Sequence, residues 1–221
     1  MCGRFVITTP MEALAALFDA APDNDLPKGE RFNVCPTQDI AVVTSVEGVR
    51  RLRSMRWGFV PEWYKSPTDG PLIINARAET VAEKPAFRLA VRERRCLIAA
   101  SGFYEWTEGD SGARLPWYIT RADGGVMALA GVWQAWEQGG QRLTGCAIVS
   151  TAAGPQMAAL HHREPVMVAQ ADWPLWLGEA GKGAASLMKS QVVGALAMHR
   201  VGVAVNSNRA VGPGQVAAVE A

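Results

Sequence analysis

The chain has 221 residues, 49% hydrophobic and 19% charged, and its 22 basic and 21 acidic side chains leave a net charge of +1. This length predicts one domain with a substantial core, and the balanced charge neither requires nor excludes a nucleic-acid partner. No apolar run is long enough to span a membrane and no apolar leader follows the first methionine, so we expect a soluble, cytoplasmic protein without membrane contact.

The first predicted elements are a short helix and a β-hairpin. Residues 11–20, MEALAALFDA, carry apolar side chains at helical spacing. Residues 39–61 predict two strands that turn at Glu47-Gly48. The strongest helical pattern covers residues 80–95, TVAEKPAFRLAVRERR, where alanine and leucine recur along one face.

Most of the remaining elements are expected to be strands. The strand-like runs, separated by turns at residues 122–125 and 138–141, are residues 96–106, 115–120, 126–136, 143–151, 163–169 and 201–205. Residues 153–160 and 172–178 predict short helices. Many strands with few helices favour an α+β fold, a single domain with a mainly antiparallel, barrel-like β-sheet core and a few flanking helices. We expect the domain to span residues 1–208 and residues 209–221 to form a flexible tail.

The four cysteines are widely scattered, at Cys2, Cys35, Cys96 and Cys146. Their spacing fits neither a disulfide framework nor a zinc site. The last three lie in apolar surroundings, so we expect them to pack as small hydrophobic residues. Cys2 differs, because removal of Met1 would leave it with a free thiol and a free α-amine two carbons apart.

Both groups of an N-terminal Cys2 are partly nucleophilic at neutral pH, because their reference pKa values are about 8.5 for the thiol and about 7.7–8.0 for the amine. Gly3 lets the backbone approach closely. Arg4 is expected to lower the pKa of the thiol or to hold an anion. The alternative is that a cysteine follows the start codon by chance.

Two further motifs carry polar groups suited to catalysis. In INARAET, residues 74–80, Asn75 and Arg77 share one face of an extended segment, where an amide and a guanidinium suit an oxyanion or a phosphate. A helix-entry turn is the alternative.

In SGFYEW, residues 101–106, Glu105 lies between aromatic residues, where partial desolvation favours a general acid or base. A salt-bridged or exposed glutamate is the alternative there.

Two of the chain's three histidines lie in LHHREPV, residues 160–166. His161, two positions before Arg163, is suited to move protons near neutral pH, and a structural histidine is the alternative. Adjacent strand residues point to opposite faces, so we expect only one of His161 and His162 to reach a site, and we expect no metal. The glycine-rich GEAGKGA, residues 178–184, lacks the spacing of a phosphate loop.

Arginines and tryptophans occur beside these motifs. The run VRRLRSMRWG, residues 49–58, fits a phosphate-facing surface and a solvated face equally well. Trp57 and Trp106 are predicted to stack on unpaired bases. Four other tryptophans are expected to fill the core: Trp117, Trp133, Trp173 and Trp176.

In their order and spacing, these motifs resemble the SOS response-associated peptidase (SRAP) family. The segments that carry the resemblance, from Met1 to about Asn208, are MCGRF, FNVCPTQ, MRWGFVPEW, NARAETVAEKPAFR, RRCLIAASGFYEW, AGVW, LHHREPV and VAVNSN. The resemblance implies a protein that crosslinks covalently to abasic sites in single-stranded DNA and so shields the lesion from strand cleavage. We expect it to act as a monomer, without a cofactor, and to associate with the nucleoid through DNA.

The resemblance also implies roles by position. Cys2 would close a thiazolidine ring with the sugar aldehyde, Asn75 would orient the N-terminus and the opened sugar, and the residues that move protons would be Glu105 and His161. The DNA channel would be lined by Arg4, Trp57, Arg77, Trp106 and Arg163. Two positions depart from the family pattern, since Glu164 replaces a typical methionine and Ala99 a usual proline.

Two other functional classes stay open. An N-terminal-nucleophile cysteine amidohydrolase or peptidase would use the α-amine of Cys2 as the base for its thiol, and it would turn over amides without DNA. A non-catalytic reader of modified bases would keep full DNA binding in Cys2→Ala and form nothing covalent.

Overall fold

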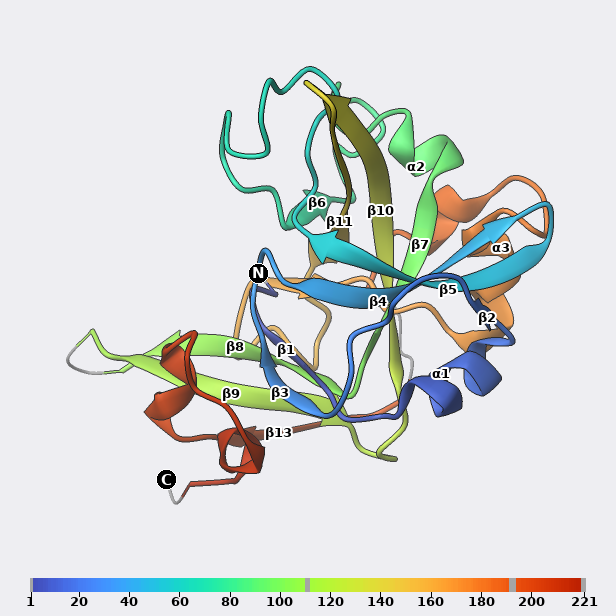
Figure 1. The fold of residues 1–221 in the computed structure, drawn as a ribbon. Helices are drawn as coiled ribbons and strands as arrows, with labels where there is room; N and C mark the ends of the chain where they lie inside the picture. The colour runs from blue at the N-terminus through green and yellow to red at the C-terminus, as the bar shows by residue number, and fades with distance from the viewer. Residues whose placement is uncertain (1, 110–111, 191–193, 220–221) are drawn as a thin grey trace.

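The computed structural model describes residues 2–109, 112–190 and 194–219, which form two β-sheets with few helices (Figure 1). The smaller sheet has five strands in the order β13-β9-β8-β1-β3. Its strands are β1 (Phe5–Ile7), β3 (Arg31–Val34), β8 (Gly102–Glu108), β9 (Arg114–Arg121) and β13 (Leu196–Arg200). All four of the pairings that build this sheet are antiparallel.

The larger sheet has seven strands in the order β12-β11-β10-β7-β4-β5-β2, and an eighth strand, β6, pairs with β11. Its strands are β2 (Ala21–Pro22), β4 (Asp39–Val46), β5 (Val49–Trp57), β6 (Asn75–Arg77), β7 (Arg95–Ala100), β10 (Met127–Gln138), β11 (Gln141–Ala152) and β12 (Arg163–Pro165). A parallel pairing of Gly145 on β11 with Arg56 on β5 closes five of these strands into a barrel. This architecture confirms the predicted α+β fold with a barrel-like, mainly antiparallel core.

Two hairpins of the barrel have tight glycine-containing turns where the sequence predicted them. β4 and β5 are joined at Glu47 and Gly48, which have φ values of 52° and 78°. β10 and β11 are joined at Gly139 and Gly140, with φ values of 56° and 77°. Two consecutive positive φ values are typical of the type I′ turn, whose twist matches that of the flanking strands.

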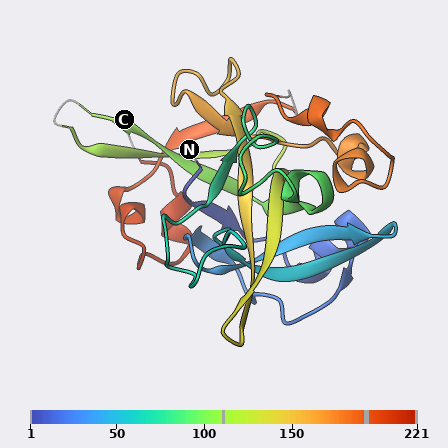
Figure 2. The same cartoon turned by 90° about the horizontal axis from the view of Figure 1, so that it is seen from above.

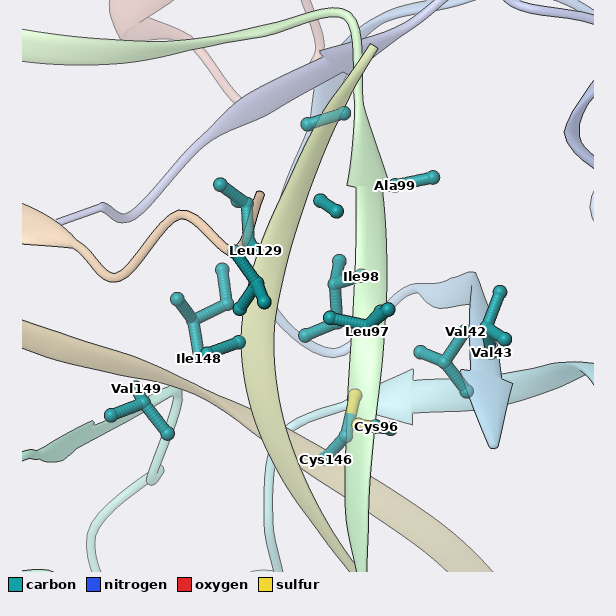
Figure 3. Close-up of a cluster of buried hydrophobic side chains, with 14 of the residues drawn as sticks. Val42, Val43, Cys96, Leu97, Ile98, Ala99, Leu129, Cys146, Ile148 and Val149 are labelled. Carbon is teal, nitrogen blue, oxygen red and sulfur yellow. The ribbon is translucent and has the colours of Figure 1, made fainter. Parts of the chain in front are cut away.

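Aliphatic side chains of neighbouring strands fill the core (Figure 3). Leu97 and Ile98 on β7 pair with Val43 and Val42 on β4, and Ile98 pairs with Leu129 on β10. All five side chains are completely buried. Three cysteines are buried as predicted: Cys35, Cys96 and Cys146.

Short helices cover one side of the barrel (Figure 2). Helix α1 (Met11–Phe18) forms where it was predicted, and Phe18 stacks on Trp173 of α3 (Trp173–Leu177) with ring centroids 4.3 Å apart. Two short 3-10 turns, η1 (Gln170–Asp172) and η2 (Ala184–Leu187), flank α3. In the described part of the chain, no helix combines the length and apolar character needed to cross a membrane.

The helix predicted over residues 80–95 is largely wrong. Only Ala90–Glu93 form a helix, α2, and the preceding residues form successive turns. Pro85 accounts for the difference, because proline lacks an N–H and disfavours helical backbone in the residue before it. Single helical turns form on either side of it, with the Lys84 N–H bonded to Thr80 O and the Arg88 N–H bonded to Lys84 O.

The single strand predicted over residues 96–106 is two strands in two different sheets. β7 belongs to the barrel and β8 to the smaller sheet, and the chain bends between them at Ser101. The bend is held by Ser101, whose N–H donates to Val6 O and whose Oγ accepts from the Thr8 N–H at 3.0 Å. Consequently Glu105 lies in the smaller sheet, beside the start of the chain.

Two other predicted elements differ from the structure. Residues 201–205 are not a strand, because the last strand is β13 and Val203–Asn206 form the 3-10 turn η3. Residues 153–160 form turns rather than a helix. In the expected tail, Pro213–Val216 form the 3-10 turn η4 and the Val219 N–H donates to Arg200 O at 3.0 Å. The domain boundary at residue 208 stays a prediction.

Candidate functional site

Cys2 lies just before β1, where the chain enters the smaller sheet. β1 pairs antiparallel with β8, and the Tyr104 N–H extends this pairing by donating to Arg4 O at 3.0 Å. Continuing the antiparallel register brings Gly3 alongside Glu105. The sheet therefore places the N-terminal segment against the strand that carries the predicted acid.

The Cys2 side chain is completely buried, and its Sγ lies 3.8 Å from Arg4 O. Burial raises the pKa of the Cys2 thiol above its ordinary value, and the negative charge of Glu105 raises it further. This shift is opposite to the one expected from Arg4. The guanidinium of Arg4 instead donates to Asn33 Oδ1 at 3.0 Å and to the backbone oxygen of Val205.

Asn75 reaches Cys2 from the larger sheet. β6 runs parallel to β11, with Asn75 opposite Ile148. The Nδ2 of Asn75 donates to Cys2 O at 3.0 Å. Its Oδ1 is buried and accepts no hydrogen bond from the described residues. A buried acceptor without a donor is costly, so this oxygen marks a position where the N–H or O–H of a bound molecule is stabilised.

Glu105 is a buried carboxyl group on β8. Its side chain is 3% exposed, and the residue lies opposite Trp117 on β9. The charge of Glu105 is close enough to the Cys2 thiol to affect its pKa. The predicted acid and the predicted nucleophile are therefore neighbours, although they are far apart in the sequence.

His161 lies immediately before β12, with its Nδ1 against the backbone of Arg163. The Arg163 N–H is 2.9 Å from Nδ1 and the Arg163 carbonyl oxygen is 3.1 Å from it. A neutral ring can accept from the N–H, and a protonated ring can donate to the carbonyl, so Nδ1 has a partner in either protonation state. With Nδ1 engaged by the backbone, a proton transfer by this ring would use Nε2.

Of the two histidines only His161 lines the cavity described below, as expected, but the strand geometry that this expectation assumed is wrong. Neither residue belongs to a strand, and their rings stack with centroids 4.3 Å apart. The proximity of His161 lowers the pKa of His162. The described residues contain no group of three or more histidine, cysteine or acidic side chains arranged to hold a metal.

A cavity of about 640 Å³ opens beside these groups, although neither Cys2 nor Asn75 is among its described lining residues. Glu105 and His161 both line it, together with Gly3 and Arg4 from the N-terminal segment. The cavity continues along β8 and β9 to Trp106 and to residues that the sequence analysis did not single out, Arg114 and Asn206.

Trp106 is held at this cavity by two polar contacts. Its Nε1 donates to Asn206 Oδ1 at 2.6 Å, and the guanidinium carbon of Arg114 lies 4.8 Å from the ring centroid. Asn206 belongs to the segment VAVNSN, which the sequence analysis noted only as part of a pattern. Arg114 had no sequence signal, because its proximity to Trp106 depends on the pairing of β8 with β9.

Trp57 does not reach the cavity. Its side chain is completely buried, its Nε1 donates to Ile74 O at 3.1 Å, and its ring contacts Phe5 with centroids 5.1 Å apart. The buried ring leaves no face for a base, so the stacking role predicted for Trp57 is inconsistent with its position. Trp57 is instead a core residue.

The two arginines predicted beside the site have different environments. Arg77 is exposed on β6, two residues after Asn75. Arg163 forms a two-pronged ion pair with Glu79, with N–O distances of 2.8 and 3.0 Å, and also donates to Ser150 O. This ion pair lowers the pKa of Glu79. The charge of Arg163 is therefore already neutralised, whereas that of Arg77 faces solvent.

In the basic run at residues 49–58, two arginines are also paired with carboxylates. Arg50 contacts Glu179 at 2.8 Å and Arg53 contacts Asp23 at 2.6 Å. These contacts favour a solvated, charge-balanced face over a phosphate-binding surface.

Comparison with known proteins gives a consistent family match. The family model described as SOS response associated peptidase (SRAP) matches residues 1–208. The chain is 38% identical over 181 residues to the abasic site processing protein YoaM of Bacillus subtilis, covering 80% of this chain and 79% of YoaM. It is 30% identical over 200 residues to the abasic site processing protein YedK of Escherichia coli, covering 87% of each chain.

Among solved structures, a protein from Bacteroides thetaiotaomicron has a similar fold. It superimposes with a TM-score of 0.84 at 22% identity, covering 99% of this chain and 100% of that one. At this identity the likeness supports the fold alone.

Proposed function

Because the chain belongs to the SOS response associated peptidase (SRAP) family, we propose that it binds abasic sites in single-stranded DNA and crosslinks to them through Cys2. The names of YoaM and YedK, abasic site processing proteins, support the choice of lesion. The observation that carries the proposal is that Asn75 donates to the Cys2 carbonyl and the Glu105 charge acts on the Cys2 thiol, while Glu105 and the adjacent Gly3 line one cavity. The reaction requires removal of Met1, which frees the α-amine of Cys2.

The first step opens the sugar. An abasic deoxyribose is mostly a closed hemiacetal, and opening it removes the proton of the C1′ hydroxyl while the ring oxygen gains one. Glu105 accepts the first proton, and protonated His161 donates the second from Nε2. The Arg163 backbone holds Nδ1 in place, so the ring can present Nε2 to the sugar.

The second step joins the protein to the sugar. The α-amine of Cys2 adds to the C1′ aldehyde carbon, and the hydroxyl of the adduct leaves as water with the proton held by Glu105. The product is an iminium ion. Asn75 Oδ1 stabilises the adduct by accepting from its N–H or O–H, which gives this buried oxygen a donor that the described residues do not supply.

The third step closes the ring. The Cys2 sulfur adds to C1′, the electron pair of the C=N bond returns to nitrogen, and the thiol proton passes to the Glu105 carboxylate. Because burial and Glu105 raise the thiol pKa, the thiol is protonated at neutral pH and needs this neighbouring base. The five-membered thiazolidine removes the iminium ion that promotes strand breakage, and the attack is fast because it is intramolecular.

The DNA strand is proposed to follow the cavity along β8 and β9. The exposed guanidinium of Arg77 and the cavity-lining groups of Arg4 and Arg114 suit phosphates, and Trp106 suits an unpaired base. Affinity should therefore fall as salt rises, and duplex DNA should react poorly. All four reacting side chains come from one chain, which supports a monomer as the active form, located with cytoplasmic DNA.

The test uses a single-stranded oligonucleotide with one abasic site, separated on a denaturing gel. The expected result is a stable shifted band that Cys2→Ala abolishes and that the matched cysteine variant Cys35→Ala retains. Cys2→Ser can form the imine without a stable ring, so its band should appear only after borohydride reduction. Absence of a band at any protein excess, or full activity of protein that still carries Met1, would overturn the proposal.

An amide-hydrolysis assay and a DNA-affinity measurement, run beside the gel, separate the other functional classes. Hydrolysis of amide substrates without DNA would instead indicate an N-terminal-nucleophile amidohydrolase. Unchanged DNA affinity in Cys2→Ala, with no covalent band from the wild type, would indicate a non-catalytic reader.

A further inference from the structure

A second cavity of about 640 Å³ lies between α2, α3 and η2. Both helices lie together on the side of the barrel away from β8 and β9 (Figures 1 and 2). Among the described residues, this cavity shares no lining residue with the candidate site. Part of its wall is apolar and comes from Val91, Trp176, Leu177 and Met188.

The charged groups around this second cavity are mainly basic. Arg92, Arg95 and Lys182 line it, and the acidic side chain in the described lining is Glu93. The Glu93 carboxylate also lies 3.7 Å from the guanidinium of Arg94, which offsets part of its charge. The cavity therefore combines an apolar wall with a net positive charge.

Backbone oxygens hold the guanidinium of Arg95 in place. Its Nη1 donates to Val91 O at 2.8 Å and to Arg92 O at 2.7 Å, and its Nε donates to Trp176 O. Its Nη2 has no hydrogen-bond partner in the described part of the chain. Burial lowers the pKa of Arg95, because the cation is partly removed from water. A bound anion would restore the lost charge stabilisation.

The loop that follows α3 passes close to this cation. Gly178, Gly181 and Gly183 have φ values of 88°, 86° and 126°, a backbone region that side chains disfavour. A Cβ on Gly178 would lie 3.0 Å from Arg95 Nη2, so glycine permits the close approach. The segment GEAGKGA is not a phosphate loop by spacing, yet in the fold its Lys182 lines the same cavity as Arg95.

We propose that this cavity binds a small organic anion, a phosphate or carboxylate group carried on an apolar or aromatic body. The head group contacts Arg92, Arg95 and Lys182, and the body packs on the apolar wall. An inorganic anion alone would leave the wall uncovered, and a neutral apolar molecule would leave the three cations without a counter-charge. The proposal is independent of the chemistry at Cys2.

Isothermal titration calorimetry of the whole protein tests it, with phenyl phosphate as the organic anion. Inorganic phosphate supplies the head group alone, and benzyl alcohol supplies the body alone. Phenyl phosphate is expected to bind at least about tenfold more tightly than either. Lys182→Glu should weaken phenyl phosphate binding by at least about tenfold, because it replaces a charge-assisted contact by repulsion.

Two further variants distinguish this site from general attraction of anions. Ala185→Trp places a large side chain at an exposed lining position and should block phenyl phosphate. Arg142→Glu makes the same charge change as Lys182→Glu, but at a side chain on the β10–β11 hairpin that is 79% exposed. This variant should bind phenyl phosphate like the wild type. Crosslinking at Cys2 should be unchanged in all three.

The proposal is overturned if phenyl phosphate does not bind at millimolar concentration, or if Lys182→Glu and Ala185→Trp bind it like the wild type while their melting temperatures show that they are folded. Binding of phenyl phosphate by a protein that forms no crosslink would overturn only the proposed function.

Discussion

The side-chain amide of Asn75 holds the carbonyl oxygen of Cys2 at 3.0 Å, across 73 positions of the chain. The two residues come from different sheets, since Asn75 lies on β6 and Cys2 leads into β1. This hydrogen bond links the barrel to the N-terminal segment at the point where the proposed chemistry occurs.

Replacing Asn75 should slow the crosslink without removing DNA binding. Asn75→Ala loses the contact that orients Cys2, and we expect the rate to fall at least about tenfold because a misplaced nucleophile rarely attacks. A time course on denaturing gels measures the rate, and fluorescence anisotropy measures affinity for undamaged single-stranded DNA. The matched control is Asn24→Ala, which removes an asparagine bonded to Ser54 instead. A wild-type rate in Asn75→Ala would exclude an orienting role.

Replacing Glu105 should lower the pKa of the Cys2 thiol but slow the crosslinking reaction. Burial and the Glu105 charge both raise the pKa of Cys2, so Glu105→Gln removes one cause and should move thiol alkylation toward lower pH. Crosslinking should nevertheless slow, because the base is lost. Alkylation at a series of pH values, followed by mass spectrometry, measures the shift in the thiol pKa. Denaturing gels measure the crosslinking rate. Glu137→Gln, at a 58% exposed side chain on β10, should leave both unchanged, and no shift in Glu105→Gln would refute the coupling.

The two tryptophans predicted to stack on DNA should behave differently. Trp106→Ala should weaken binding of single-stranded DNA with little loss of stability, because Trp106 lines the cavity. Trp57→Ala should lower the free energy of unfolding by about 3–5 kcal/mol, as expected for a completely buried tryptophan. Urea denaturation and DNA titration of both variants provide the comparison. Loss of DNA affinity in a stable Trp57→Ala protein would contradict the assignment of Trp57 to the core.

Glu164, at the position where the family resemblance led us to expect a methionine, should support the loop that carries His161. It is 3% exposed, and one of its carboxylate oxygens accepts from the Gly154 N–H at 3.0 Å. Glu164→Met removes this acceptor, so we expect about 1 kcal/mol less stability and slower crosslinking. Glu164→Gln keeps an acceptor oxygen and should stay close to the wild type. If Glu164→Met has the stability and the crosslinking rate of the wild type, the hydrogen bond to Gly154 is dispensable.

Local structure was predictable where a short segment contained the turn residues or the apolar periodicity that specify it. The β4–β5 turn at Glu47-Gly48 and helix α1 follow from turn residues and from periodicity. The helical pattern over residues 80–95 failed because the apolar spacing continues through Pro85, which the backbone does not tolerate. The split of residues 96–106 was hidden because a buried strand in either sheet has the same apolar appearance.

The sequence by itself determined the candidate reactive groups of this protein, because a cysteine at position 2, an amide, a carboxyl and an imidazole are each identified by residue type alone. The tertiary structure decided which of them meet, since strand pairing brings Asn75 and Glu105 to Cys2. It also decided that Trp57 is buried and that Arg163 is paired with Glu79. Burial and ion pairing depend on contacts between segments that are distant in the chain, and residue types alone do not contain that information.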